Sequence, residues 1–183
     1  MKAHLNGPDG LLAPLPAGGQ APDFTLRQVV QATPEQALQS SRLRLRRVDR
    51  SHGLVLVFYP MDWEGVSREQ LTLYQNYIDT FTRLGARLLG ISIDHVYSHE
   101  AFAHDAQLRF PLLSDFQPRG QVARQYGVFR EAQGVSARAL FVLDHQRIIR
   151  FSKAYPDQLN PGVEELLTTL EALAAEDEMP GRR

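Results

Sequence analysis

Short apolar runs alternate along this chain with longer stretches in which apolar residues recur every three or four positions. The first pattern is typical of buried strands, and the second of helices that lay one face on a sheet. The strongest run, Leu54 to Tyr59, is continuously apolar, as expected for a central strand that is covered on both faces. Strands that alternate with helical crossovers build parallel or mixed sheets. We therefore expect an α/β fold, a central mixed sheet with helices on both faces.

The expected elements can be placed by number. Helices are expected over 33–40, 67–84, 97–107, 119–126 and from 160 onward, and strands over 42–46, 54–59, 87–94, 110–113, 138–143 and 148–153. Thr33 and Pro34 are a typical helix start, and Gly85 is placed to end the second helix. Asn160 followed by Pro161 is a cap and first-turn pair for the last helix.

The length and composition support one domain. With 183 residues and 43% apolar content, the chain can bury one sizeable core. We expect an arm over residues 1–18, a folded domain over 19–175 and a charged tail over 176–183. Pro14 and Pro16 break the apolar run that a secretory signal would need, and no stretch approaches the ~20 apolar residues that span a bilayer. A cytoplasmic protein is the expectation.

The charge of the chain is nearly balanced, with a formal net charge of -1 at pH 7. Such a chain has no long-range field that would gather nucleic acid or an anionic membrane, so neither partner is expected. Five arginines do cluster between positions 42 and 50. Because Leu43 and Leu45 alternate with them, we interpret the cluster as the solvated face of a strand rather than as a nucleic-acid interface.

The chain has no cysteine. That excludes disulfides, thiolate catalysis and thiolate metal ligands together. His99, Glu100 and His104 superficially resemble a zinc-protease motif, but the two histidines are one residue too far apart to share a helical face. His95 and His99 are four residues apart, but the sequence supplies no third metal ligand beside them. We expect solvent-facing histidines, with no metal and no cofactor.

Six motifs follow one another along the chain in the order found in one family. They are Gly19 to Leu26, Pro60 to Ser67, Gly90 to Asp94, Phe110 to Asp115, Tyr126 to Val128 and Arg138 to Asp144. Together they resemble the peroxiredoxins, the alkyl hydroperoxide reductase and thiol-specific antioxidant family, over about residues 19 to 173. The resemblance implies a thioredoxin-like fold of peroxiredoxin type. It also implies a place in cell redox homeostasis as an antioxidant oxidoreductase.

The resemblance also implies a site. In the family, the turn after the central strand reads Pro-x-x-x-Thr-x-x-Cys, and a later strand carries an active-site arginine. Here Pro60 is kept, Glu64 stands at the threonine position, Ser67 stands at the reactive cysteine, and Arg138 matches the arginine. The family's cysteine thiolate attacks hydrogen peroxide or an alkyl hydroperoxide, and a thioredoxin-like protein or a small thiol supplies the electrons. Those partners apply to this chain only if a cysteine form exists.

Serine cannot replace cysteine in that reaction. An alkoxide is not accessible near neutral pH without a general base, and oxygen has no counterpart to the sulfenic acid. An ionised Glu64 would repel a thiolate at position 67, and we expect it instead to form a salt bridge with Arg138, within ~4 Å. The chain as written should be inactive as a peroxidase. No resolving cysteine is present, so even a Ser67→Cys form would need an outside thiol.

Several interpretations of Ser67 stay open. Ser67 and Gln70 fit a capping box, which would make the serine a helix N-cap. The serine is either a natural replacement, which Glu64 favours, or a cysteine-to-serine substitution made to prevent oxidation. A natural replacement predicts a non-catalytic interaction or binding module, a pseudoenzyme. The resemblance implies that it would assemble as a homodimer, as the family commonly does.

A serine hydrolase is the remote alternative. The run Gly65 to Glu69 follows a strand and opens a helix, as a nucleophile elbow does, but Glu69 stands where the closing glycine belongs. A hydrolase would also need a histidine base. The candidates are His95, His99, His104 and His145, and nothing in the sequence places any of them beside Ser67.

Overall fold

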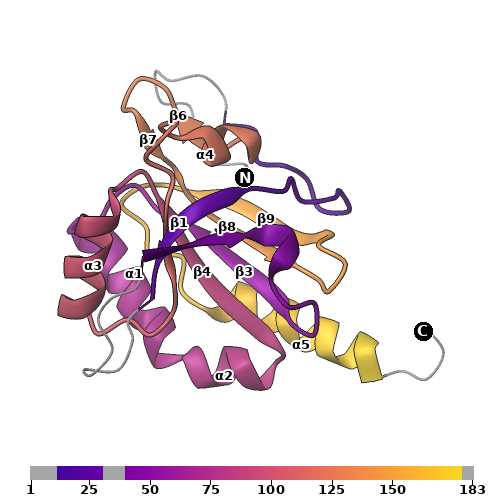
Figure 1. Cartoon of the computed structure of the whole chain (residues 1–183). Coiled ribbons are helices and arrows are strands. Elements are labelled where there is room, and N and C mark those ends of the chain that lie inside the picture. Colours follow the sequence, from indigo (N-terminus) through magenta and orange to yellow (C-terminus); the bar gives the residue numbers. More distant parts are fainter. Residues whose placement is uncertain (1–11, 31–39, 179–183) are drawn as a thin grey trace.

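The computed structural model describes residues 12–30 and 40–178, and every structural statement below refers to those residues. A seven-stranded mixed sheet runs through the centre of the molecule in the order β2-β1-β5-β4-β3-β8-β9 (Figure 1). Its strands are β1 (Thr25–Val29), β2 (Ser40–Arg44), β3 (Gly53–Phe58), β4 (Ala86–Ser92), β5 (Leu112–Ser114), β8 (Arg138–Leu143) and β9 (Ile149–Tyr155). A separate hairpin pairs β6 (Phe129–Arg130) with β7 (Val135–Ser136).

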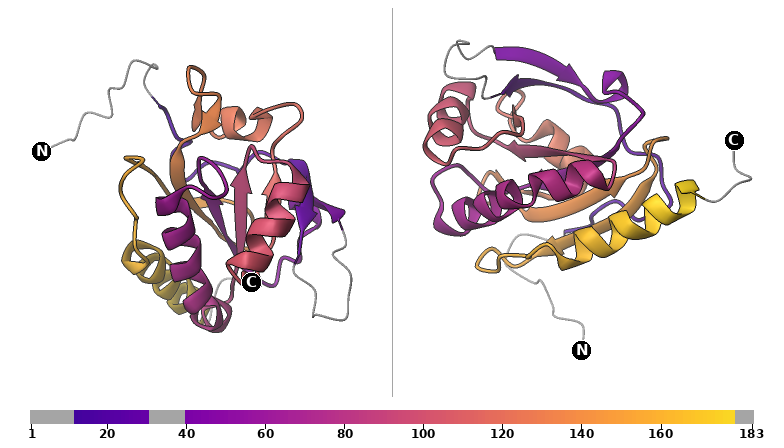
Figure 2. Two further views of the ribbon diagram at one scale, coloured as in Figure 1. Left: turned by 90° about the vertical axis from the view of Figure 1, so that its left-hand side faces the viewer. Right: turned by 90° about the horizontal axis from the view of Figure 1, so that it is seen from below.

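Helices cover both faces of this sheet, as predicted. They are α1 (Gly65–Asn76), α2 (Ile78–Arg83), α3 (Val96–Asp105), α4 (Gln121–Gln125) and α5 (Glu164–Glu178), with one 3-10 turn, η1 (Leu45–Arg47). Buried residues of α1, α2, α3 and α5 share one hydrophobic cluster, and those of α4 belong to the other. Figure 2 shows the long α5 lying beneath the sheet, alongside α1 and α2.

Strand β3 shows why the sheet has two cores. All six of its residues are buried, and successive side chains point to opposite faces. Leu54, Leu56 and Phe58 enter the cluster on the side of α4, while Val55 and Val57 enter the cluster beneath α1 and α5. β3 pairs in parallel with β4 and antiparallel with β8. The prediction of a central strand from a continuous apolar run is confirmed.

Two helices replace the single helix predicted over 67–84. The chain breaks at Tyr77, whose φ and ψ of -99° and 6° are not helical and whose amide donates to the Tyr74 carbonyl at 3.1 Å. Gly85 follows α2 with φ +68°, as expected of a glycine that ends a helix. The last helix begins at Glu164 rather than at 160, because Gly162 has φ +70°.

The arginine-rich strand predicted over 42–46 ends early, at Arg44. Leu45 is 1% exposed, and its amide donates to the carbonyl of Phe24 at 3.0 Å, so the chain turns into the core and continues as η1. The alternating pattern therefore predicted an end of the strand that is two residues too late. The helix predicted over 33–40 lies outside the described residues, except for Ser40, the first residue of β2.

The two ends of the described chain lie against the sheet and its helices. Just after α4, the carbonyl of Gly127 accepts from the Ala13 amide at 3.2 Å and the carbonyl of Tyr126 accepts from the Leu15 amide at 3.1 Å. The Gly18 amide donates to a carbonyl of β9, at residue 149, at 2.7 Å. α5 continues to Glu178, past the domain end expected at 175, and Glu176 forms a salt bridge with Arg150 at 2.7 Å. No helix of the described chain is long and apolar enough to span a membrane.

Candidate functional site

Strand pairing brings the predicted site together. β3 ends at Phe58, and the buried Pro60 lies in the turn that leads from it to α1. In the antiparallel ladder between β3 and β8, Phe58 is opposite Ala139. Arg138 therefore starts its strand beside that turn, although it is 71 residues from Ser67 along the chain.

Glu64, not Ser67, is the N-cap of α1. Its backbone is extended, and its carboxylate accepts hydrogen bonds from the amides of Val66 at 2.9 Å and Ser67 at 2.7 Å. A carboxylate at this position satisfies helix donors and meets the positive end of the helix dipole. The capping box predicted for Ser67 and Gln70 is therefore wrong: both residues lie inside the helix, and Gln70 contacts Arg138 instead.

Ser67 is fully buried and is held on two sides. Its hydroxyl donates to Oε2 of Glu64 at 2.7 Å and accepts from Nη1 of Arg138 at 3.3 Å. The hydroxyl is therefore the centre of a contact between a carboxylate and a guanidinium. A thiol at this position would face the same two charges.

The guanidinium of Arg138 is fully buried and uses all five of its N–H groups. Nη2 donates to Glu64 Oε2 at 2.9 Å, which confirms the predicted salt bridge. Nη1 donates to Gln70 Oε1 at 2.7 Å and to the Ser67 hydroxyl. Nε and Nη2 donate to the carbonyl of Asp157 at 3.2 and 3.0 Å. No donor of this arginine is left for a further ligand.

Glu64 carries a negative charge at neutral pH. Its partial burial acts to raise the pKa of the carboxyl, but hydrogen bonds from the Ser67 hydroxyl, from the Val66 and Ser67 amides and from Arg138 outweigh that effect and lower the pKa. Beyond Arg138 the contacts continue into the core, where Gln70 Nε2 donates to the Tyr74 hydroxyl at 3.2 Å. Burial raises the pKa of Tyr74, so that hydroxyl stays neutral.

This geometry gives no support to a serine hydrolase. The group that accepts the Ser67 proton in a hydrogen bond is a carboxylate of lowered pKa, which is a weak base. Three of the candidate histidines have polar partners in the structure, and none of those partners is Ser67. His95 caps α3, His99 contacts Asp62, and His145 contacts Asp177.

His99 corrects the expectation of solvent-facing histidines, because it is fully buried. Its Nδ1 lies 3.0 Å from Oδ2 of Asp62, which also accepts from the hydroxyl of Ser98 at 2.8 Å. The Tyr59 hydroxyl donates to the other oxygen of Asp62 at 2.9 Å. These contacts hold the turn between β3 and α1 against α3, a structural role that the helical spacing of His99 with Phe102 could have indicated. The described residues contain no cluster of three or more side chains suited to a metal.

Comparisons with known proteins identify the family of the chain. The family model described as "AhpC/TSA family" matches residues 17–152. The chain belongs to the AhpC/TSA family. Alkyl hydroperoxide reductase E of Mycobacterium tuberculosis is 34% identical over 139 residues, which are 76% of this chain and 85% of that protein. The putative peroxiredoxin YkuU of Bacillus subtilis is 30% identical over 163 residues, 85% of this chain and 87% of that one.

Solved structures show the same fold. AhpC of Mycobacterium tuberculosis superposes with a TM-score of 0.78 at 24% identity, covering 92% of this chain and 98% of that one. AhpC of Enterococcus faecalis gives a TM-score of 0.79 at 24% identity, covering 91% and 97%. The fold is thus the thioredoxin-like α/β fold of peroxiredoxins. Within this family, a chain without cysteine cannot follow the peroxidatic cysteine mechanism.

Proposed function

We propose that this chain is a peroxidase-inactive member of the AhpC/TSA family that serves as a non-catalytic binding or interaction module. The observation that carries the proposal is the full use of Arg138 by this chain's own groups. An arginine that stabilised a thiolate and a bound peroxide would need donors directed at them. Here those donors go to Glu64, Gln70, Ser67 and the Asp157 carbonyl.

Glu64 also favours a site in which two positions, and not only residue 67, differ from those of a thiol peroxidase. A substitution made only to silence a thiol would leave the threonine position unchanged, whereas here that position holds a carboxylate that caps α1 and pairs with Arg138. The remaining candidate is a peroxidase in which serine stands for a native cysteine, and the retained Pro60 and Arg138 are the features in its favour. The codon for residue 67 in the native gene separates the two.

A peroxide-consumption assay tests the proposal. Hydrogen peroxide and an alkyl hydroperoxide are supplied with dithiothreitol to the unaltered chain, to Ser67→Cys, and to Ser67→Cys combined with Glu64→Thr. We expect no turnover by the unaltered chain, little by the single variant, and the most by the double variant, because only there is the carboxylate gone from beside the thiol. Turnover by the unaltered chain would refute the proposal. Full turnover by Ser67→Cys alone would show that Glu64 is no barrier.

We also propose that the chain forms a homodimer through the surface around the start of α3. Large apolar side chains are exposed there: Met61, Trp63, Tyr97 and Phe116. The His95 ring contacts two of them, tilted against Tyr97 with ring centroids 4.9 Å apart and edge-on to Phe116 with centroids 5.1 Å apart. Such a patch is typical of an interaction surface. Sedimentation equilibrium of the unaltered chain and of Tyr97→Glu should give a dimer and a monomer, and a monomeric unaltered chain would contradict the idea.

A further inference from the structure

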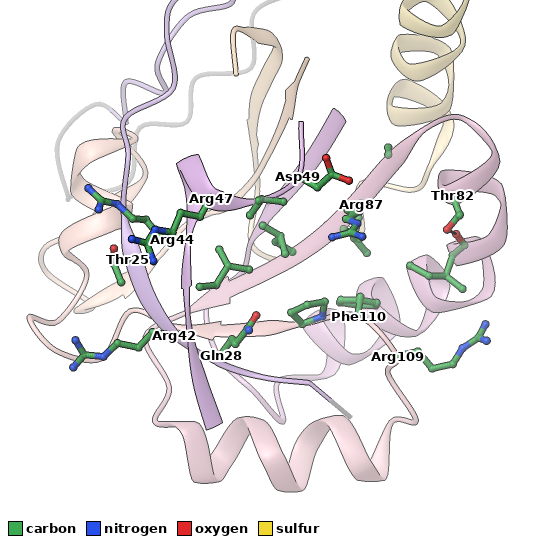
Figure 3. Close-up of a pocket in the computed structure, with 17 residues that line it drawn as sticks. Thr25, Gln28, Arg42, Arg44, Arg47, Asp49, Thr82, Arg87, Arg109 and Phe110 are labelled. Carbon is green, nitrogen blue, oxygen red and sulfur yellow. Dashed lines mark hydrogen bonds between the residues drawn. The ribbon is translucent and has the colours of Figure 1, made fainter. Parts of the chain in front are cut away.

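A cavity of about 860 Å³ lies away from the Ser67 site and shares no residue with it. One wall is formed by β2 and η1, and the other by α2 and the first half of β4 (Figure 3). Its floor is apolar, with contributions from Leu43, Val48, Ile78, Leu88, Leu89 and Phe110. Both its volume and its apolar floor are typical of small-molecule sites.

The cavity exists because β5 is short. Its three residues pair with β4 only over Gly90 to Ser92 and with β1 only over Arg27 to Val29. The first half of β4, from Ala86 to Leu89, therefore has no described strand on the side that faces β2. The sheet opens there, with residues of β2 and η1 on one side of the opening and residues of α2 and β4 on the other.

Five arginines line this opening and only one acidic residue does, which gives a formal charge of +4 (five minus one) in a chain whose net charge is -1. Figure 3 shows Arg42, Arg44 and Arg47 on one side and Arg87 and Arg109 on the other. Three residues of the sequence cluster that was interpreted as a solvated face thus join two arginines from distant parts of the chain. The spacing of these arginines in the sequence could not reveal that they line one cavity.

Three of these guanidinium groups form no salt bridge with the described residues. Arg44 pairs with Asp23 at 3.0 Å and Arg109 with Asp79 at 3.7 Å. For Arg42, Arg47 and Arg87, no ion pair occurs within the described residues.

The one acidic residue of the lining does not fill this role. The carboxylate of Asp49 accepts from the amide of Ser51 at 2.9 Å and from its hydroxyl at 2.5 Å. It is therefore directed to its own turn. Hydrogen bonds from Ser51 lower the pKa of Asp49, and the nearby charge of Arg87 adds to that effect, so Asp49 offsets part of the positive charge at Arg87. Arg42 and Arg47 keep the charge that has no ion pair within the described residues.

We propose that this cavity binds a phosphorylated small molecule with an apolar or aromatic body, the class to which nucleoside polyphosphates belong. Guanidinium groups match phosphate oxygens bidentately and are the preferred partners of phosphate in proteins. Arginines on both walls suit a ligand with more than one anionic oxygen cluster, and the apolar floor suits a ring. The phosphate backbone of an extended nucleic acid would make no use of the apolar floor.

Isothermal titration calorimetry with ATP, inorganic tripolyphosphate and adenosine tests the proposal on the full chain. We expect ATP to bind with a dissociation constant below about 1 mM at about 0.1 M salt. Tripolyphosphate should bind more weakly than ATP, and adenosine more weakly still. Arg47→Gln and Arg87→Gln should each weaken ATP binding by about tenfold, because each removes a charge-assisted contact.

Arg83→Gln is the matched control. Arg83 is exposed on α2, donates to Thr80 at 3.0 Å and lies outside the cavity lining. Arg83→Gln removes one positive charge, as each cavity variant does, and should change ATP binding by less than about twofold. Circular dichroism of each variant establishes that it is folded.

Four results would overturn the proposal. The first is that neither ATP nor tripolyphosphate binds with a dissociation constant below about 1 mM. The second is an equal loss of ATP affinity in the control and the cavity variants, and the third is tripolyphosphate binding as tightly as ATP. The fourth is a single-stranded oligonucleotide that binds more tightly than ATP with the same dependence on Arg47 and Arg87. The third result would show that an apolar part of the ligand contributes nothing to binding. The last would make the surface a nucleic-acid interface.

Discussion

The charge of Glu64 should hold the start of α1 and the buried Arg138 together, and Glu64→Gln tests this. Glutamine keeps the shape but has one acceptor oxygen, whereas the carboxylate accepts from two amides, one hydroxyl and Arg138. Hydrogen bonds to a charged group contribute about 1 kcal/mol more than neutral ones, and a charge at a helix start adds up to about 1 kcal/mol. The carboxylate side chain is 29% exposed, so solvent screening reduces the sum.

We therefore expect the free energy of unfolding at pH 7 to fall by about 2 kcal/mol in Glu64→Gln. With a urea slope of about 2 kcal/mol/M, the unfolding midpoint should fall by about 1 M. Fluorescence of Trp63, the only tryptophan, reports the transition from the turn just before α1. Glu131→Gln is the control, since its salt bridge with Arg124 is exposed to solvent and its loss should move the midpoint far less.

The difference between the two proteins should depend on pH. The pKa of Glu64 is lowered in the folded state from an ordinary value of 4.5, so its contribution is present above pH 4.5 and is lost as the pH falls through the folded pKa. The midpoints of the unaltered chain and Glu64→Gln should therefore converge as the pH falls below 4.5. A midpoint shift below about 0.3 M at pH 7, or a difference that stays the same at acid pH, would refute the reasoning.

Three further predictions concern a thiol at position 67, the buried Asp115 and the contact of Gly127. In Ser67→Cys, Glu64 should raise the pKa of the thiol, so adding Glu64→Thr should speed alkylation by iodoacetamide at pH 7 about tenfold, and equal rates would contradict this. Burial raises the pKa of Asp115 to about 6, against the lowering effect of the Ala123 and Val122 amides that it accepts from. The unaltered chain should therefore lose stability relative to Asp115→Asn as the pH rises from about 4 to 6 and then stay level, as measured by urea unfolding. Gly127 has φ +71°, and a Cβ there would clash with the Ala13 carbonyl, so Gly127→Ala should release the segment before Pro16 to limited proteolysis, while Gly65→Ala, which meets open space, should not.

The sequence predicted those features that depend on local pattern. β8 runs from Arg138 to Leu143 with the bounds expected, because its apolar run is flanked by polar residues on one side and a turn on the other. The Glu64 to Arg138 contact was also predictable, since the motif order implied that the two positions meet and opposite charges at one site attract.

Features that depend on distant contacts were not predictable. His99 is buried because Asp62 lies beside it, 37 residues earlier in the chain, and nothing near His99 reveals that partner. The role of Ser67 was misjudged for a similar reason, since a capping pattern cannot show that Glu64 is already in the capping position. The arginine cavity combines residues of β2, η1 and β4 with Arg109, and only the folded sheet brings them together.

The contact of Glu64 with Arg138 also bears on how such a chain could change over generations. A cysteine returned to position 67 alone would lie beside a carboxylate, and a threonine returned to position 64 alone would leave a buried arginine without its acid. The two positions are therefore coupled, because the effect of a change at residue 67 or residue 64 depends on which side chain occupies the other position. A comparison of related sequences should accordingly find a carboxylate at position 64 where position 67 lacks cysteine, and a hydroxyl at position 64 where cysteine is present.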